Sequence, residues 1–168
     1  MQFCSLYHVT SPENLPLILQ DGFKDHAAKK GVPGLIVTQE FAPGVWLADV
    51  PRKTAISVDQ FLCHQDEAWI EVMATEAFYQ RHMIGNEWRD SSWPTRQWLV
   101  PACEVNKLIR REVPLVEVLK LRLANKSTEH HAFYTAEVMR RQIANEMDGD
   151  IQARWNAALD AAALEVLS

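Results

Sequence analysis

His8 and Thr10 are the first residues of the chain whose types and spacing could do chemistry. They lie two positions apart in Leu6–Thr10, a run of aromatic and β-branched residues that predicts a β-strand. Alternate residues of a strand point to the same side, so the imidazole and the hydroxyl would share one face. Together they could hydrogen-bond a sugar or a phosphate. On these two residues alone a structural role is the better interpretation, because a lone histidine is more often structural than chemical.

A helix is predicted directly after this strand. Ser11 followed by Pro12, or Asn14 followed by Pro16, could begin it, and the sequence leaves both starts open. Gly22 is placed to end the helix in a left-handed conformation. The apolar stripe of this helix consists of Leu15, Ile18 and Leu19. The histidine therefore stands near the carboxyl end of a strand that opens onto a helix, where ligands often meet open backbone groups.

Composition indicates a soluble globular domain. The 168 residues are 48% hydrophobic and 23% charged, which is enough for a sizeable core. A net charge of −5 argues against sequence-independent nucleic-acid binding over the whole surface, although a local basic cleft stays possible. No apolar run approaches the ~20 residues that span a bilayer, and we expect a cytoplasmic protein. The cysteines lack metal or disulfide spacing and are expected to be reduced: Cys4, Cys63 and Cys103.

Two later segments predict further strands, the first of them followed by a helix. Gly44–Asp49 (Gly-Val-Trp-Leu-Ala-Asp) predicts a tight strand, and Asp49 is a good cap for a helix that would run to about Val58. Gln97–Val100 predicts a late strand that ends before a proline. Between them, Ala68–Ala74 predicts a central strand with both faces partly apolar, and Glu76–Met83 predicts a short helix.

The remaining segments are less regular. Lys24–Pro43 is polar and rich in glycine and proline, so we expect a long loop with a short extended piece. Gly85–Thr95 is expected to be a second polar loop, whose Trp88 and Trp93 would anchor it or stack against a base or an acceptor. Leu115–Leu123 alternates apolar and charged residues and predicts a strand.

The C-terminal part predicts two helices. The first would be capped by Ser127 or Thr128, and Asp150 would cap a last, alanine-rich helix after a turn. We therefore predict a domain over residues 1–124 and a two-helix appendage over residues 125–168 that packs on it. The pair His130-His131 makes a weak metal candidate, because no other ligand-spaced residue lies near it.

The order of the three motif segments resembles the diphtheria-toxin-like branch of the ADP-ribosyltransferases, which includes the poly(ADP-ribose) polymerases. That branch carries His-Gly-Thr/Ser, then Gly-[Ile/Val]-Tyr-[Phe/Leu]-Ala-Asp before a helix, then Asn-Glu-Tyr-[Ile/Leu]-Val. Here the matching runs are His8–Thr10, Gly44–Asp49 and Arg96–Val100. The resemblance covers about residues 5–123. A nearer likeness is to small bacterial relatives with a His-Val-Thr opening and an Arg-Glu-Trp-Leu-Val-Pro-Ala segment.

The resemblance implies an α+β fold with a split β-sheet core, flanking helices and NAD as co-substrate. It implies a glycosyltransferase that moves one ADP-ribose to a protein, nucleic-acid or small-molecule acceptor and releases nicotinamide. His8 would bind the adenosine-side ribose, with the Thr10 hydroxyl beside it. The backbone of Val9 would bind the nicotinamide carboxamide, and Trp46 would stack on the nicotinamide in place of the family tyrosine. Gln97 would take the position of the catalytic glutamate.

Gln97 departs from the family pattern in charge. A glutamine keeps a hydrogen bond to a ribose hydroxyl but supplies no negative charge for the reacting ribosyl carbon. The residue indicates a natural low-activity or binding-only variant, another acid acting in its place, or an engineered change. The substitutes to consider are Glu71, Glu87 and Glu104.

Two other functions remain open. An RNA 2′-phosphotransferase shares the fold but needs several arginines around a phosphate. A non-catalytic module would keep the fold to bind NAD, ADP-ribose or a partner protein. The basic residues that could meet a pyrophosphate are Arg52, Lys53, Arg81, Arg89 and Arg96.

Overall fold

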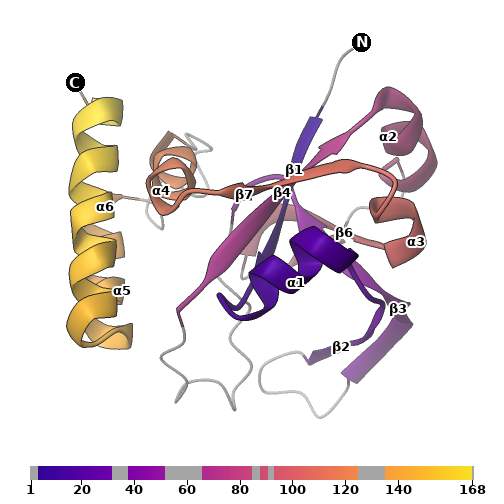
Figure 1. Ribbon diagram of the computed structural model, residues 1–168, viewed down its shortest axis with the longest axis horizontal. Helices are drawn as coiled ribbons and strands as arrows, with labels where there is room; N and C mark the ends of the chain where they lie inside the picture. Colours follow the sequence, from indigo (N-terminus) through magenta and orange to yellow (C-terminus); the bar gives the residue numbers. More distant parts are fainter. Residues whose placement is uncertain are drawn as a thin grey trace.

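A seven-stranded sheet forms the centre of the protein (Figure 1). The structure is a computed structural model and describes residues 4–31, 38–51, 66–84, 88–90, 93–124 and 135–167. The strands are β1 Cys4–Thr10, β2 His26–Gly31, β3 Thr38–Ala48, β4 Ala68–Ala74, β5 Trp88–Asp90, β6 Trp93–Val100 and β7 Ile109–Val113. Their order is β5-β6-β3-β1-β4-β7, with β2 paired to β3, and each of these pairs is antiparallel. The α+β class is therefore confirmed.

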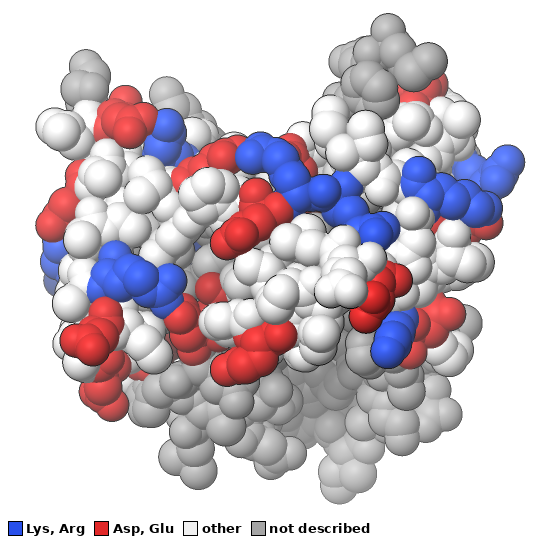
Figure 2. All heavy atoms as spheres, viewed as in Figure 1, with Lys and Arg blue, Asp and Glu red and all other residues white. Residues whose placement is uncertain are grey.

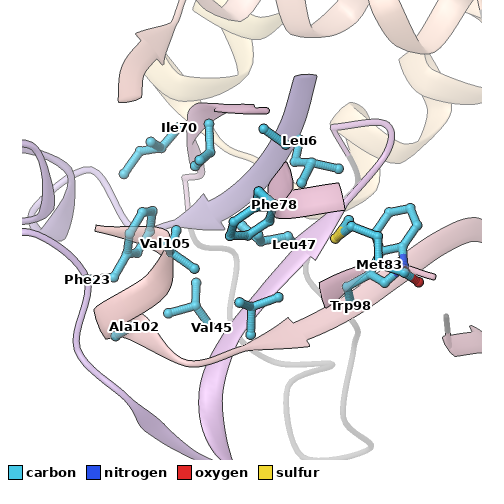
Figure 3. Packing of buried hydrophobic residues seen from close by; sticks show 13 residues of the cluster. Leu6, Phe23, Val45, Leu47, Ile70, Phe78, Met83, Trp98, Ala102 and Val105 are labelled. Carbon is cyan, nitrogen blue, oxygen red and sulfur yellow. The ribbon is translucent and has the colours of Figure 1, made fainter. Parts of the chain in front are cut away.

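Helices cover both sides of the sheet. They are α1 Asn14–Asp21, α2 Glu76–His82, α3 Ala102–Val105, α4 Leu115–Ala124, α5 Ala136–Glu146 and α6 Gly149–Leu167. Residues of α1, α2 and α3 pack with one side of the sheet in a first core cluster (Figure 3). Residues of α4, α5 and α6 pack with the other side in a second cluster. We call these sides the α1–α3 face and the α4–α6 face. Within the described part of the chain, no helix is long and apolar enough to cross a membrane.

Successive side chains of each strand point alternately to the α1–α3 face and to the α4–α6 face. In β1, Leu6 belongs to the first cluster and Tyr7 to the second. In β4, Ile70 belongs to the first cluster and Trp69 to the second. The same alternation decides which potential site residues share a face.

The sheet opens between β1 and β3. β1 pairs with β4 along its whole length, from Cys4↔Ala74 to Thr10↔Ala68. With β3 the only register pair in the described strands is Tyr7↔Ala48. A continued antiparallel ladder would place Val9 opposite Trp46, but these two residues form no register pair.

Several predicted elements are confirmed. β1, β4, β6 and α2 form where local pattern placed them, and β4 lies between two other strands. α1 forms as predicted, but its N-cap residue is Glu13, which makes no side-chain cap hydrogen bond, so neither predicted cap, Ser11 or Asn14, holds that position. The Asn14 N–H donates to the Ser11 hydroxyl oxygen, with 3.4 Å between nitrogen and oxygen. Gly22 ends α1 with a φ of 90° and a ψ of 174°. Its positive φ agrees with the prediction, although the conformation is extended and not helical.

The prediction of two long loops was wrong. Lys24–Pro43 contains β2 and most of β3, which pair from His26↔Gly44 to Gly31↔Thr38. Gly85–Thr95 contains β5 and the start of β6, so Trp88 and Trp93 lie in strands. In both places backbone pairing with a neighbouring strand satisfies the polar groups that a polar sequence would otherwise expose to water.

The predicted strand Leu115–Leu123 is also wrong, because this segment forms helix α4. The helix begins after Pro114, whose carbonyl accepts the Val118 N–H at 3.0 Å. Val118, Leu119 and Arg122 are its buried residues and lie on one helical face. Since the buried residue Arg122 is charged, the helical period is hidden in a hydrophobicity pattern.

The C-terminal helices are α5 and α6. Thr135 caps α5, and its side-chain oxygen accepts the Val138 N–H at 3.3 Å. The predicted caps Ser127 and Thr128, and His130-His131, lie outside the described residues. The apolar stripes of both helices enter the second cluster through Met139, Ile143, Trp155 and Leu159. Val118 and Leu119 of α4 are in the same cluster, so the helical layer crosses the boundary predicted at residue 124.

Candidate functional site

His8 lies at the opening between β1 and β3. Its Nδ1 is 3.0 Å from the backbone carbonyl oxygen of Trp46. A carbonyl can only accept, so Nδ1 must carry the proton in this hydrogen bond, and the lone pair of the neutral ring is on Nε2. An imidazole side chain therefore joins the first two motif strands where their backbone ladder stops.

The imidazole packs on the α1–α3 face. Its ring centroid is 5.0 Å from that of Phe23, with the two rings at 79°, an edge-to-face arrangement. Phe23 belongs to the first cluster, as does Leu6, two positions before His8 on the strand. Thr10 shares this face by alternation. Val9 points to the opposite side and is partly buried against the second cluster.

Trp46 and Gln97 lie on the other face. Trp46 stands between Val45 and Leu47, both in the first cluster, so its half-buried side chain points to the α4–α6 face. Gln97 precedes Trp98, also of the first cluster, and points the same way. The structure thus brings Trp46 and Gln97 to one face and places the His8 imidazole on the other.

The Gln97 amide is buried and incompletely bonded. The residue is 3% exposed, and its Nε2 has no hydrogen-bond partner among the described residues. A buried donor without a partner typically costs about 1–3 kcal/mol. Such a group is a candidate to bind a ligand.

Gln97 belongs to a row of residues that crosses the sheet. The strand registers place Gln97 opposite Ala48, Ala48 opposite Tyr7, Tyr7 opposite Glu71, and Glu71 opposite Arg111. Tyr7 is buried, and burial, followed by the negative charge of Glu71, raises its pKa. Tyr7 and Arg111 were not among the predicted site residues. Only the register, which no local pattern predicts, aligns them with Gln97.

Glu71, one of the acids considered as substitutes, does not lie beside Gln97. It lies three strands from Gln97 in this row, about 14 Å at the usual strand spacing. It is buried and paired with Arg111, whose Nη2 also contacts Glu117 at 2.7 Å. The hydrogen bond from Arg111 lowers the pKa of Glu117, and the hydrogen bonds to both carboxylates raise the pKa of Arg111.

The other two proposed substitutes do not stand beside Gln97 either. Glu104 lies on α3, where Lys107 contacts it at 2.8 Å and lowers its pKa. Glu87 lies outside the described residues. Within the described chain, therefore, none of the predicted substitutes takes the position of the family carboxylate.

The basic residues do not gather into a phosphate site in the described part of the chain. Arg96 bonds to Asp49 through its Nε, at 3.0 Å, and its backbone N–H, at 3.1 Å. Arg81 is exposed and lies 3.9 Å from Glu104. Arg52 and Lys53 lie outside the described residues, as does the side chain of Arg89. On the face shown in Figure 2, basic and acidic side chains are interspersed, in keeping with the net charge of −5.

The described residues contain exposed thiols but no cluster of metal-ligand side chains. Cys4 and Cys103 are exposed free thiols, and partial burial raises the pKa of Cys4. The described residues contain no group of three histidine, cysteine, aspartate or glutamate side chains that could hold a metal ion.

In comparisons with known proteins, no family model, curated protein or solved structure matches the chain.

Proposed function

We propose that the protein is a mono-ADP-ribosyltransferase that uses NAD and releases nicotinamide. Its three motif segments lie on β1, β3 and β6, which are neighbours in the sheet. The observation that carries the proposal is the hydrogen bond from His8 Nδ1 to the Trp46 carbonyl at the place where the sheet opens. The resemblance implies a split β-sheet core and a histidine at the adenosine-side ribose, and this contact supports the proposal because it fixes the imidazole beside the second motif strand.

The separation of the site residues over two faces suits a dinucleotide. NAD carries two ribose rings joined by a pyrophosphate, so one molecule can meet groups on both sides of an opening. In our proposal the lone pair of His8 Nε2 accepts a hydroxyl of the adenosine-side ribose, with Thr10 on the same face. The nicotinamide half lies on the other side, where Trp46 offers an aromatic surface and the backbone of Val9 meets the carboxamide.

The Gln97 amide then faces the nicotinamide-side ribose. Its buried Nε2 gains a partner there, and its carbonyl oxygen accepts a ribose hydroxyl. The bond between the ribose and nicotinamide breaks, a nucleophile of the acceptor attacks the same carbon, and the acceptor loses a proton. Because glutamine is neutral, it does little for the positive charge that develops on the ribosyl carbon. We expect slow turnover.

A non-catalytic NAD- or ADP-ribose-binding module is the second candidate. The neutral, buried Gln97 favours it, because a binding site needs hydrogen bonds but no negative charge. The phosphotransferase alternative has less support, since the described arginines Arg96 and Arg111 are engaged by carboxylates.

Calorimetry with NAD tests binding, and mass spectrometry after incubation with NAD and a cell lysate tests transfer. We expect NAD to bind the parent protein and to bind His8→Ala at least tenfold more weakly. His26→Ala is a control for the loss of one histidine. Equal NAD affinity in parent and His8→Ala, or no binding by either, would contradict the proposal. NAD binding without any modified product would select the binding module.

A further inference from the structure

Asn106, directly after α3, holds the backbone of Phe23 with two hydrogen bonds. Its Oδ1 accepts the Phe23 N–H at 2.7 Å, and its Nδ2 donates to the Phe23 carbonyl at 2.9 Å. The two residues are 83 positions apart in sequence. One amide thus satisfies both backbone polar groups of a residue that lies between α1 and β2 and has no strand partner of its own.

The surrounding contacts show that this arrangement is closely fitted. Residues 22–25 form the linker between α1 and β2. A Cβ atom on Gly22 would lie 2.7 Å from Asn106 Oδ1, so the linker backbone comes closer to this amide than a residue with a side chain at position 22 would allow. Next to it, Asp25 Oδ1 accepts the Ala102 N–H at 2.7 Å, which ties the linker to α3 a second time. Arg110 Nη1 lies 3.3 Å from the Asn106 carbonyl oxygen.

We call the two hydrogen bonds between Asn106 and the Phe23 backbone the clamp. Phe23 connects this clamp to His8. Phe23 is 5% exposed and lies in the α1–α3 core (Figure 3). Its ring meets the His8 imidazole edge-to-face, with 5.0 Å between the ring centroids. A ring held between a packed aromatic and a carbonyl acceptor has few orientations. We infer that Asn106 is a positioning residue of the proposed NAD site, which fixes Phe23 and through it keeps His8 Nδ1–H on the Trp46 carbonyl.

The inference rests on the proposed function only for its effect on NAD. Its structural part concerns the tautomer of one histidine in the free protein. Long-range nitrogen–proton NMR spectra of the ¹⁵N-labelled protein distinguish an imidazole protonated on Nδ1 from one protonated on Nε2. Comparison with His8→Gln assigns the His8 signals. In the parent protein at neutral pH we expect His8 to be the Nδ1–H tautomer.

Two variants separate the clamp from the ring. Asn106→Asp keeps an acceptor for the Phe23 N–H but removes the donor to the Phe23 carbonyl, while Arg110 can stabilise the new carboxylate. Phe23→Leu leaves the backbone clamp in place and removes the aromatic ring. Lys107→Ala is the matched control, because its side chain is adjacent in sequence and bonds to Glu104 instead.

We expect Asn106→Asp and Phe23→Leu each to give His8 a measurable Nε2–H population and to weaken NAD binding roughly three- to tenfold. The double variant should be little worse than either single one, since both act through the same contact. Lys107→Ala should match the parent in tautomer and affinity.

The outcomes that would overturn the inference are distinct. A parent His8 in the Nε2–H form, or variants that unfold more easily while His8 keeps the parent tautomer, would reduce Asn106 to a purely structural role. If the parent fails to bind NAD, the proposed function fails, whereas the NMR comparison still decides the role of Asn106.

Discussion

Arg122 of α4 donates a hydrogen bond from Nε to the backbone carbonyl of Pro51, at 2.7 Å. Pro51 follows the second motif segment by two residues, so the helical layer holds the chain where it leaves that segment. The guanidinium carbon lies 5.1 Å from the ring centroid of Trp69, and the residue is only 6% exposed. On α6, the Trp155 indole N–H donates to Asp66 Oδ1 at 3.0 Å. Helices α4 and α6 therefore hold the chain at Pro51 and at Asp66.

Arg122→Met should lower the free energy of unfolding by about 2 kcal/mol or more, because it removes a charge-assisted hydrogen bond and a buried cation–π contact. Chemical denaturation measures the change. Arg140→Met on α5 is the control, since Arg140 and its partner Asp160 are both largely exposed. Such a surface ion pair contributes at most about 1 kcal/mol. Equal losses in the two variants would mean that Arg122 does not anchor the chain.

Gly22→Ala should destabilise the protein by about 2 kcal/mol or more, since its backbone conformation is nearly restricted to glycine and a Cβ would meet the Asn106 side chain. Gly149→Ala offers a matched comparison. Gly149 has a φ of 54°, but a Cβ there would find nothing within 4 Å. Its replacement should cost about 1 kcal/mol, from strain alone. If thermal denaturation ranks the two glycines in the opposite order, the close contact with Asn106 is not present in solution.

Glu117→Gln should make the free energy of unfolding depend less steeply on pH in acidic solution. The hydrogen bond from Arg111 lowers the pKa of Glu117 below 4.5, the ordinary value for a glutamate side chain. A carboxylate with a lowered folded pKa binds protons less readily when folded, so it stabilises the fold above that value. This contribution is lost as pH falls below 4.5 through the folded pKa.

Urea unfolding at neutral pH and at successively lower pH checks the effect. Glu13→Gln, on the exposed start of α1, is the control for losing one carboxylate. The two variants should diverge in the slope of stability against pH below 4.5. Parallel slopes would show that the contact between Arg111 and Glu117 contributes nothing to folding.

The sequence predicts those elements of the fold whose apolar pattern is local, and it does not predict those that depend on contacts with distant residues. β1, β4 and β6 carry compact apolar patterns that hold whatever surrounds them. In α4, helical spacing is shown by Leu115, Val118, Leu119 and Arg122. Because the buried residue Arg122 is charged, the apolar pattern does not show this period, and the segment was wrongly predicted to be a strand. Strands β2 and β5 are polar and exist through pairing with neighbours, which local composition does not encode.

The candidate site shows the same division. Motif order predicted that β1, β3 and β6 would lie together, as they do in the sheet. It did not predict that the His8 imidazole would lie on the face opposite to Trp46 and Gln97. Tertiary packing decides this, through the contact of His8 with Phe23 and the end of the β1–β3 ladder at Tyr7.

Gln97→Glu tests the proposed chemistry most directly. A carboxylate at this position would accept the ribose hydroxyl and would also stabilise the positive charge on the ribosyl carbon more in the transition state than in the ground state. Restoring a preorganised electrostatic contact of this kind is worth about 3 kcal/mol, or roughly a hundredfold in rate. NAD affinity should change much less, because both side chains keep an acceptor oxygen. Rates of nicotinamide release and NAD affinities of both proteins decide the matter.

Burial sets the condition under which this gain appears. Gln97 is 3% exposed, so a carboxylate there loses hydration and its pKa is expected to rise. The rate of Gln97→Glu should therefore increase with pH until the new carboxyl group is ionised, a dependence that the parent glutamine lacks. Gln142→Glu on the exposed side of α5 controls for the added charge. An active parent whose rate is unchanged by Gln97→Glu would place the catalytic charge on another residue. If both proteins bind NAD and neither releases nicotinamide, the chain is a binding module, and the buried amide serves recognition alone.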